Sequence, residues 1–455
     1  MGGSRRGSSA RAKARVDVGE WEEEGGAVRV LRHEWRVLRF NESTRQSVAR
    51  VATVAVDVTV TGEKRDVITG GKGEGERRGV ILQRQQPDCL AFEYLKSMAA
   101  VALTSCHLHH PHLSVPPAAS PTASPPLRVL CLGLGGGSLP LFLAHELPSA
   151  HIDAVEIDPA VIAAARQHMG FPAWAVRPKA DSRSGLETQA EAPVADQTPL
   201  VKGQGAAAAA AAEQVVWRDI FGRVAVYNED AVSFVVRAAE RIGRGGGEAQ
   251  NAAGGEHGGR LNKEAGVGSG DAGDGEEQQE PYDLVLVDVF DGSDETPPEL
   301  LDRDGPFLRA LARVVHPKHG TLVMNVHADV PSPSLWERVT GRFGDGWADE
   351  STQRGRRIHA ICRAYSSALL HPAESHNSSS LSSGIAFTTT TSSQGNMTLV
   401  VQRGVVLGGS GDRQAELEGR LKEAAAVVEE GGAVPFTVAP RVVRGLKVLP
   451  VEWRS

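Results

Sequence analysis

The sequence predicts an α/β fold with a doubly wound, mostly parallel sheet, preceded by a small N-terminal β unit. Short apolar segments that can be buried on both faces alternate with helical patterns between residues 128 and 326. A glycine-rich segment follows the first of these apolar segments, and an acidic residue ends the second. Together the three observations indicate a βαβ unit that opens a nucleotide-binding sheet.

The N-terminal part of this 455-residue chain is expected to differ from the rest. Residues 1–27 are predicted to be a disordered tail, and alternating Val- and Leu-rich segments in 28–61 predict the small β unit, in the role of a lid. A charged, glycine-rich loop is expected at 62–79. Apolar residues at helical spacing then predict a helix over 90–103, with a loop over 106–126.

The main sheet follows from five apolar segments, each expected to be a parallel strand, and from one late segment expected to be an antiparallel edge strand. The parallel strands are predicted at 128–132, 152–156, 224–227, 284–288 and 321–326, and the antiparallel strand at 396–402. Helical patterns lie at 139–146, 159–168, 231–242 and 305–315. This alternation is typical of a doubly wound sheet.

Three segments interrupt the pattern. Residues 178–214 contain a poly-alanine run, 243–280 are mostly small and polar, and 371–383 are rich in Ser. Because none has enough apolar content to offset the entropy of ordering, we expect disordered insertions in surface loops. The main domain is then predicted over 79–404, followed by a C-terminal extension over 405–455.

The glycine-rich segment and the acidic strand end carry the first candidate site. Gly133, Gly135 and Gly137 stand where the backbone must turn sharply and where a ligand can approach with no Cβ in the way. Glu156 ends the next predicted strand, about 20 residues on, where its carboxylate can accept both hydroxyl protons of a ribose.

The segments GLGGGSLP, at 133–140, and VEIDP, at 155–159, resemble motif I and the acidic second strand of class I S-adenosylmethionine-dependent methyltransferases, and more narrowly the spermidine-synthase-like branch. The resemblance implies a Rossmann-like methyltransferase fold and S-adenosyl-L-methionine as cofactor. It also implies that Asp230 and Ala231 lie against the adenine and that Gln46 closes over the cofactor. Asp230 directly precedes a helical pattern, so it is equally expected to be an N-cap.

A second candidate site follows the fourth predicted strand. Asp288 ends that strand, and Asp291 stands three residues later in a Gly-Ser turn. The carboxyl ends of parallel strands face the ligand crevice, and Asn325 and His327 are expected to face it too. The two aspartates have the spacing of the spermidine synthase D-x-x-D signature, whose resemblance implies a general base and an amine-binding carboxylate. We predict both as catalytic, with a solvated turn as the alternative for Asp291.

The sequence departs from the aminopropyltransferase pattern in two places. Tyr94 matches the first residue of that family's Tyr-His-Glu motif, but Leu95 and Lys96 follow it, and Ser138 replaces an expected aspartate. A lysine at a polyamine site inverts the local charge. The leading hypothesis is therefore an S-adenosylmethionine-dependent methyltransferase acting on an amine of a protein or of a small molecule. The alternatives are a spermidine-synthase-like aminopropyltransferase of polyamine biosynthesis and a non-catalytic nucleotide-binding scaffold.

Composition limits the partners. The net charge of -7 and the pI of about 6.1, with no sustained basic face, predict no nucleic-acid partner. The sequence contains no run of about 18 apolar residues, the length that would predict a membrane span, so a soluble protein is expected. A homodimer is one assembly we consider. The cytoplasm is the expected location, or an organelle if the Arg- and Ser-rich residues 1–16 are a transit peptide.

Cysteine and histidine patterns do not predict a metal site. The four cysteines lack paired ligand spacing and are expected to be buried thiols in a reducing compartment. A histidine cluster has no Cys or carboxylate ligand at a fixed spacing, and we therefore predict no metal ion there. It comprises His107, His109, His110 and His112.

Overall fold

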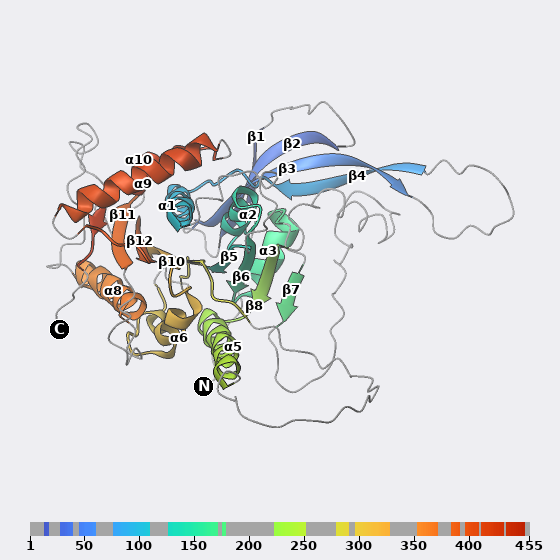
Figure 1. Cartoon of the computed structure of the whole chain (residues 1–455). Helices are drawn as coiled ribbons and strands as arrows, with labels where there is room; N and C mark the ends of the chain where they lie inside the picture. Colours follow the sequence, from blue (N-terminus) through green and yellow to red (C-terminus); the bar gives the residue numbers. More distant parts are fainter. Residues whose placement is uncertain are drawn as a thin grey trace, which may run out of the picture.

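A computed structural model of the chain shows two sheets, a large one flanked by helices and a smaller antiparallel one beside it (Figure 1). The structure describes residues 13–17, 28–39, 45–60, 76–109, 126–171, 175–178, 223–251, 279–290, 296–327, 353–371, 384–391, 396–408, 411–431 and 434–450. None of the helices in these ranges is long and apolar enough to cross a bilayer.

The large sheet has the strand order β13-β11-β12-β10-β9-β5-β6-β8-β7. The run from β10 to β7 is parallel throughout, and β12, β11 and β13 extend it through antiparallel pairs. The strands are β5 (Arg128–Leu132), β6 (His151–Glu156), β7 (Ala175–Pro178), β8 (Val224–Asn228), β9 (Leu284–Val287), β10 (Thr321–His327), β11 (Gly384–Thr390), β12 (Asn396–Arg403) and β13 (Lys447–Val448). The predicted doubly wound, mostly parallel fold is confirmed.

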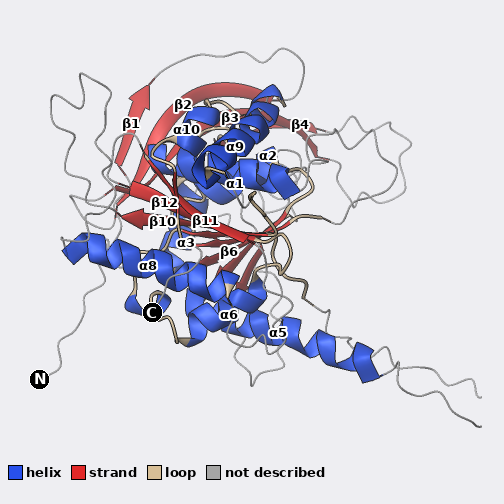
Figure 2. Cartoon of the chain, turned by 60° about the vertical axis from the view of Figure 1, so that its left-hand side comes forward, coloured by secondary structure: helices blue, strands red, loops and turns tan. Residues whose placement is uncertain are grey.

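Helices cover both faces of this sheet, which is why its strands are apolar on both sides (Figure 2). Along β5, Val129 and Cys131 join one hydrophobic cluster and Leu130 and Leu132 join the other. The first face carries α1 (Glu93–His109), α2 (Ser138–Glu146), α3 (Pro159–His168), α9 (Arg413–Glu430) and α10 (Ala439–Val443); the second carries α5 (Ala231–Asn251), α6 (Pro306–Val314) and α8 (Gln353–Leu370), and a 3-10 turn spans Pro298–Leu300.

The small sheet has the order β1-β2-β3-β4 and is antiparallel throughout; its strands are β1 (Lys13–Asp17), β2 (Val28–Arg39), β3 (Arg45–Val60) and β4 (Glu76–Gln85). It is hydrogen-bonded to the start of α2. Gln85 Nε2 donates to Ser138 Oγ at 2.7 Å, and Ser138 Oγ donates to the carbonyl oxygen of Val48 at 3.3 Å. The backbone N–H of Gln85 donates to the carbonyl of Gly170 at 2.9 Å. These bonds hold the N-terminal sheet against the start of α2 and against the residues that follow α3.

The structure corrects several predicted boundaries. Residues 13–17 form a strand inside the predicted tail, and residues 76–79, expected to be loop, begin β4. The first helix begins at Glu93 and includes residues 106–109, which were predicted to be loop. The helix that starts at Ala231 continues into the predicted insertion, because extending a packed helix requires far less free energy than nucleating one. The remainder of that insertion, 252–278, lies outside the described residues, as do 179–222 and 372–383.

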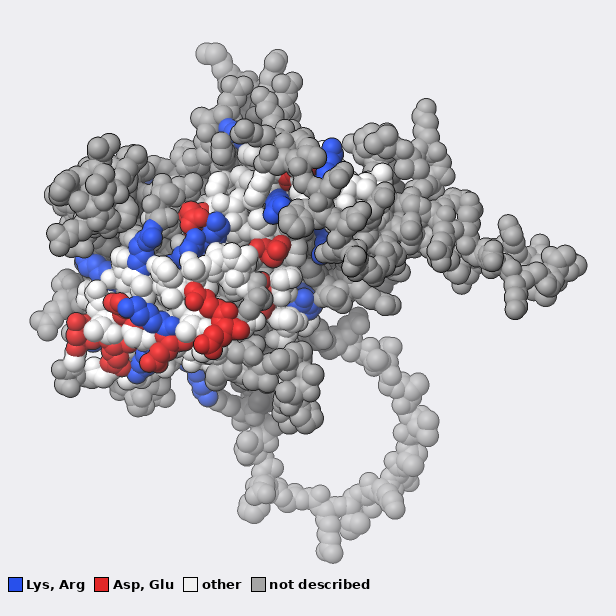
Figure 3. Space-filling model, turned by 90° about the horizontal axis from the view of Figure 1, so that it is seen from above, with Lys and Arg blue, Asp and Glu red and all other residues white. Residues whose placement is uncertain are grey.

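The C-terminal part of the chain completes one face of the large sheet. The predicted edge strand β12 is interior, because β11 pairs with its far side and β13 pairs with β11. Leu417, Leu421 and Ala425 of α9, with Val442 and Leu446, belong to the hydrophobic cluster on that face. Figure 3 shows acidic and basic side chains side by side on this part of the surface, and on α9 Glu416 pairs with Arg420 and Glu418 with Lys422.

Candidate active site

The turn after β5 needs glycine for steric reasons. Gly133, Gly135 and Gly137 have φ values of 94°, 53° and 79°, in the left-handed region that favours glycine. A Cβ at Gly133 would lie 2.3 Å from the carbonyl oxygen of Asp288. The N–H of Gly133 donates to the carbonyl of Val155 at 2.9 Å. The turn therefore brings the carboxyl ends of β5, β6 and β9 close together.

Glu156 lies at the end of β6, with its carboxylate against this turn. Its Oε2 accepts hydrogen bonds from the N–H groups of Leu134 at 3.2 Å and Gly135 at 3.4 Å, and its Oε1 accepts from the N–H of Asp158 at 3.0 Å. Burial raises the pKa of Glu156, and the three backbone hydrogen bonds oppose that rise. The arrangement presents a carboxylate acceptor beside the glycine turn.

The end of β8 adds a cap and an apolar surface. Asp230 Oδ2 accepts a hydrogen bond from the N–H of Ser233 at 2.9 Å, so the predicted N-cap is confirmed, and Ala231 begins the helix behind it. Asn228 Nδ2 ties β8 to β6 by donating to the carbonyl oxygen of Ile157 at 3.1 Å. Ile157 is 65% exposed. Sequence reasoning missed this residue, although its place directly after Glu156 could have signalled an exposed apolar side chain at this edge.

Asp288 directly follows β9 and is held by two side chains from other elements. Its Oδ1 accepts a hydrogen bond from Nδ2 of Asn325 on β10 at 2.9 Å, and its Oδ2 accepts from the hydroxyl of Tyr94 on α1 at 3.3 Å. Burial raises the pKa of Asp288, and the two hydrogen bonds act to lower it. Burial and the nearby Asp288 carboxylate raise the pKa of Tyr94 well above its usual value, so the phenol stays protonated and donates.

The same edge of the sheet carries an aromatic pair. His327 ends β10, and its ring lies 4.1 Å from that of Phe290, centroid to centroid, with the planes tilted by 45°. Asn325 and His327 were both predicted at this edge. The structure brings Asn325 to Asp288, whereas His327 contacts the aromatic ring two residues further along the chain from Asp288.

The side chains of two predicted site residues lie outside the described part of the chain. Asp291 lies outside the described residues. Gln46 belongs to β3, but its side chain is outside the part of the chain that the structure describes. The next residue, Ser47, lies close to the glycine turn, because a Cβ at Gly136 would be 2.6 Å from Ser47 Oγ. The role of Gln46 toward a cofactor stays a prediction.

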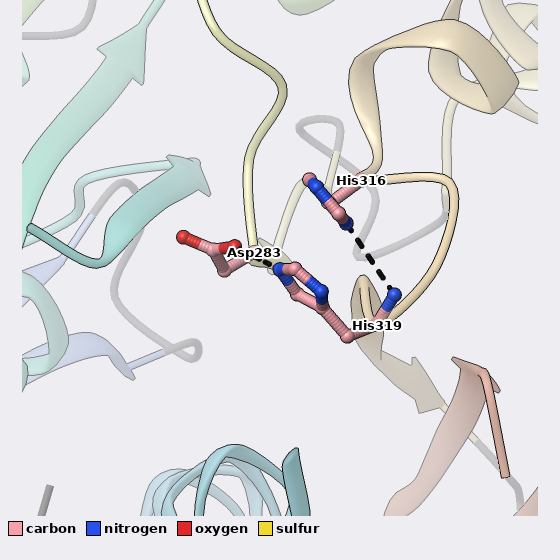
Figure 4. Close-up of side chains that lie close together, drawn as sticks. All are labelled: Asp283, His316 and His319. Atoms are coloured by element: carbon pink, nitrogen blue, oxygen red, sulfur yellow. Dashed lines mark hydrogen bonds and ion pairs between the residues drawn. The ribbon is translucent and has the colours of Figure 1, made fainter. Parts of the chain in front are cut away.

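A group of three residues with ligand-like spacing lies at the opposite edge of the sheet (Figure 4). Asp283 Oδ1 lies 2.7 Å from Nε2 of His319, and Asp283 Oδ2 accepts from the N–H of Arg128 at 2.8 Å. His316 Nδ1 accepts from the backbone N–H groups of Lys318 at 3.3 Å and His319 at 3.4 Å. With Nδ1 an acceptor, a neutral His316 carries its proton on Nε2 and has no lone pair left there for a metal. The group therefore works as a hydrogen-bonded turn.

One member of the predicted histidine cluster lies near this turn. The ring of His109, at the end of α1, is 6.3 Å from that of His319, centroid to centroid. His110 and His112 lie outside the described residues.

Comparison with known proteins gives short matches in sequence. No family model matches the chain. Over 46 residues the chain is 56% identical to the eEF1A lysine and N-terminal methyltransferase of Mus musculus and to that of Homo sapiens, and the match covers 10% of this chain and 7% of each relative. Over the same length it is 50% identical to a polyamine aminopropyltransferase of Vibrio vulnificus, covering 15% of that protein. The sequence motifs likewise resemble the C-terminal domain of the dual elongation factor 1 alpha methyltransferase.

Solved structures give longer but weaker matches. Human methyltransferase-like protein 13 in complex with SAH aligns with a TM-score of 0.37 at 17% identity, over 74% of this chain and 93% of that one. A probable spermidine synthase from Corynebacterium glutamicum aligns with a TM-score of 0.35 at 13% identity, over 92% and 95%. An O-methyltransferase from Bacillus cereus in complex with SAH aligns with a TM-score of 0.29 at 11% identity, over 70% and 84%.

Proposed function

We propose that the protein is an S-adenosylmethionine-dependent methyltransferase that transfers a methyl group to an amine of a protein or of a small molecule. The observation that carries the proposal is the placement of Glu156 and Asp288 at the ends of β6 and β9, the two strands that flank β5 and its glycine turn. In a doubly wound sheet this edge is where nucleotide ligands bind. The short sequence matches to a methyltransferase and to an aminopropyltransferase support the same class of cofactor.

The cofactor would be held by the ends of β5, β6 and β8. Glu156 would accept the two ribose hydroxyls, and the exposed side chain of Ile157 would cover one face of the adenine. Asp230 and Ala231 would lie at the adenine edge, as the motif resemblance implies. The glycine turn would let the methionine part approach the backbone with no Cβ in the way. When bound, S-adenosylmethionine supplies an electrophilic methyl carbon on a sulfonium.

Asp288 would act on the acceptor. An amine attacks only as the neutral base, so an ammonium must first lose a proton. Asp288 can accept that proton, because burial raises the pKa of its carboxyl, while Asn325 and Tyr94 keep it in one orientation. With the cofactor bound, the sulfonium would supply the methyl group to the neutral amine and leave as a thioether, and the remaining contribution of the protein would be positioning and exclusion of water.

An aminopropyltransferase is the second candidate, and the contact between Tyr94 and Asp288 is the observation that favours it, since both residues match that family's motifs. Two other residues do not match the aminopropyltransferase pattern. Lys96 Nζ lies 2.7 Å from Glu93 Oε1, which puts a cation where the family has an acid. Ser138 is buried, and its hydroxyl bonds Gln85 instead of facing a ligand. A non-catalytic nucleotide-binding scaffold is the third candidate.

The proposal includes an acceptor amine on a protein or on a small molecule. It also includes a homodimeric assembly, the lack of a nucleic-acid partner and a cytoplasmic location. The mammalian relatives are named for methylation of eEF1A, which makes a protein acceptor the first to test. The alignment covers 7% of those relatives, so the acceptor has to be identified independently for this chain.

Calorimetric titration of the purified protein with S-adenosylmethionine and with its decarboxylated form, in parallel, tests the proposal. We expect the carboxylated cofactor to bind more tightly. Tighter binding of the decarboxylated form would favour the aminopropyltransferase, and no binding of either would refute both enzyme assignments. Transfer of a labelled methyl group to protein acceptors then separates a methyltransferase from a scaffold.

A further inference from the structure

We propose that a second subsite, beside the candidate active site, binds a carboxylate of the acceptor peptide. This rests on the proposed function. The subsite is a cavity of about 80 Å³ between the first helix and the C-terminal extension, whose role the sequence leaves open. It is lined by Glu93, Ser97, Thr390, Pro440, Arg441 and Arg444.

The cavity lies at the same edge of the sheet as Asp288. Thr390 ends β11, which runs in the direction of β10 because both are antiparallel to β12. On β12, Asn396 pairs with His327 and the next residue pairs with Thr390. The carboxyl ends of β10 and β11 are therefore level with each other. Glu93 comes directly before Tyr94, whose hydroxyl reaches Asp288. A peptide bound with its amine at Asp288 can therefore place a flanking residue at the cavity.

The charges that line the cavity favour an anion. Glu93 is already paired twice, with Lys96 Nζ at 2.7 Å and with Arg441 Nη2 at 2.8 Å. Within the described part of the chain the guanidinium of Arg444 makes no hydrogen bond or ion pair, although its carbonyl accepts from the N–H of Thr390 at 2.9 Å. The Nε atom of Arg441 is buried without a hydrogen-bond partner. Arg441 donates through Nη2 to Glu93 and through Nη1 to the carbonyl oxygen of Thr437, so among the described residues Arg444 is the guanidinium at the cavity whose donors are open to a ligand.

Guanidinium groups match the planar geometry of a carboxylate. The hydroxyl of Thr390 donates to the carbonyl oxygen of Arg444 at 3.4 Å, and Ser97 also lines the cavity. A cationic ligand would have to displace Arg441 or Lys96 from Glu93, which costs a charge-assisted hydrogen bond.

Fluorescence anisotropy with a pair of labelled peptides tests the proposal on the full chain. One peptide has a single lysine followed by four glutamates, and the other has four glutamines in their place. We expect the wild type to bind the glutamate peptide about tenfold more tightly than the glutamine peptide. Arg444→Gln should abolish this preference, since Arg444 lines the cavity, and should leave the melting temperature unchanged because its side chain makes no bond among the described residues.

The matched control is Arg420→Gln, which removes an arginine from the exposed face of α9, where it pairs with Glu416. It should keep the preference. Equal binding of the two peptides by the wild type, or equal loss in both variants, would overturn the subsite. Competition with inorganic phosphate and with acetate separates the sources of the anion: if phosphate displaces the peptide at much lower concentration than acetate, the assignment to a peptide carboxylate is wrong.

Calorimetry with S-adenosylmethionine distinguishes failure of the subsite from failure of the proposed function. Cofactor binding without a glutamate preference would overturn only the subsite. A glutamate preference that depends on Arg444, in a protein that binds no S-adenosylmethionine, would support the subsite as a peptide site and overturn the methyltransferase.

Discussion

Replacing Asp288 by asparagine separates the charge of this residue from its hydrogen bonds. The side-chain oxygen of an asparagine can still accept the bond that Asn325 Nδ2 donates at 2.9 Å, and its amide can approach the hydroxyl of Tyr94. The variant therefore keeps the packing of the site and loses the group that would take a proton from the acceptor amine. Removing a general base lowers turnover by about 10²-fold or more. The affinity for S-adenosylmethionine should change much less.

The same substitution should stabilise the protein at neutral pH. Burial raises the pKa of Asp288 in the folded state above its unfolded value of about 3.9. A carboxyl with a raised folded pKa contributes stability below the unfolded pKa and loses that contribution as the pH rises through the folded pKa. Each unit of the difference corresponds to about 1.4 kcal/mol at neutral pH. Asp288→Asn should therefore raise the melting temperature at pH 7, and the gain should shrink as the pH falls toward 4.

Two measurements test this reasoning together. Single-turnover methyl transfer to an identified acceptor reports on chemistry, and thermal unfolding at pH 7 and at pH 5 reports on the buried charge. Equal rates for the wild type and for Asp288→Asn would remove Asp288 from the catalytic residues. The melting temperature of the variant should exceed that of the wild type by more at pH 7 than at pH 5. A smaller difference at pH 7 than at pH 5 would refute the assignment of a destabilising buried carboxylate.

Three further predictions concern the cofactor site and the insertions. Glu156→Gln should weaken S-adenosylmethionine binding in calorimetry by about 1.5 to 3 kcal/mol, the range for hydrogen bonds to a charged group. The control Glu240→Gln, on the exposed face of α5, should leave the affinity unchanged. Unchanged affinity in a folded Glu156→Gln variant would contradict the ribose assignment. In urea denaturation, Gly133→Ala should lower the free energy of unfolding by about 2 kcal/mol or more, because alanine disfavours a φ of 94° and its Cβ would lie 2.3 Å from a backbone carbonyl oxygen. The control Gly419→Ala, in the middle of α9 where no atom lies near the new Cβ, should raise it by about 0.5 to 1 kcal/mol. Deleting residues 252–278 and joining the ends with a short Gly-Ser linker should leave cofactor affinity unchanged and shift the melting temperature little, because the composition of the segment offers almost nothing to bury; a large drop would show that it packs.

Local signals in the sequence were enough to predict the βαβ unit and most of the large sheet. Apolar runs such as 284–287 could be recognised as strands, because a strand buried on both faces is apolar at every position. The glycine at 133 could be predicted because its backbone position requires that residue type, and the acid at 156 because it ends the next apolar strand after the glycine turn. Asp230 could be predicted as an N-cap because capping depends only on the next three residues.

Tertiary structure decided how distant segments meet. Strand order predicted Asn325 at the same edge as Asp288, but not the hydrogen bonds that Asn325 and Tyr94 donate to its carboxylate, because these depend on how β10 and α1 pack around β9. The two residues of β13 are recognisable as a strand only through their pairing with β11.

The N-terminal and C-terminal segments show the same division. Alternating Val and Leu predicted strands in 28–61, but only folding could show that Gln85 of β4 bonds the start of α2. Residues 405–455 were predicted only as a C-terminal extension, and packing alone placed Arg441 beside Glu93. The sequence by itself determined which segments form strands, helices and tight turns, because periodicity, capping and glycine torsions act over a few residues. Only the tertiary structure decided which side chains share a site, because those contacts join residues far apart in the chain and depend on how every element packs.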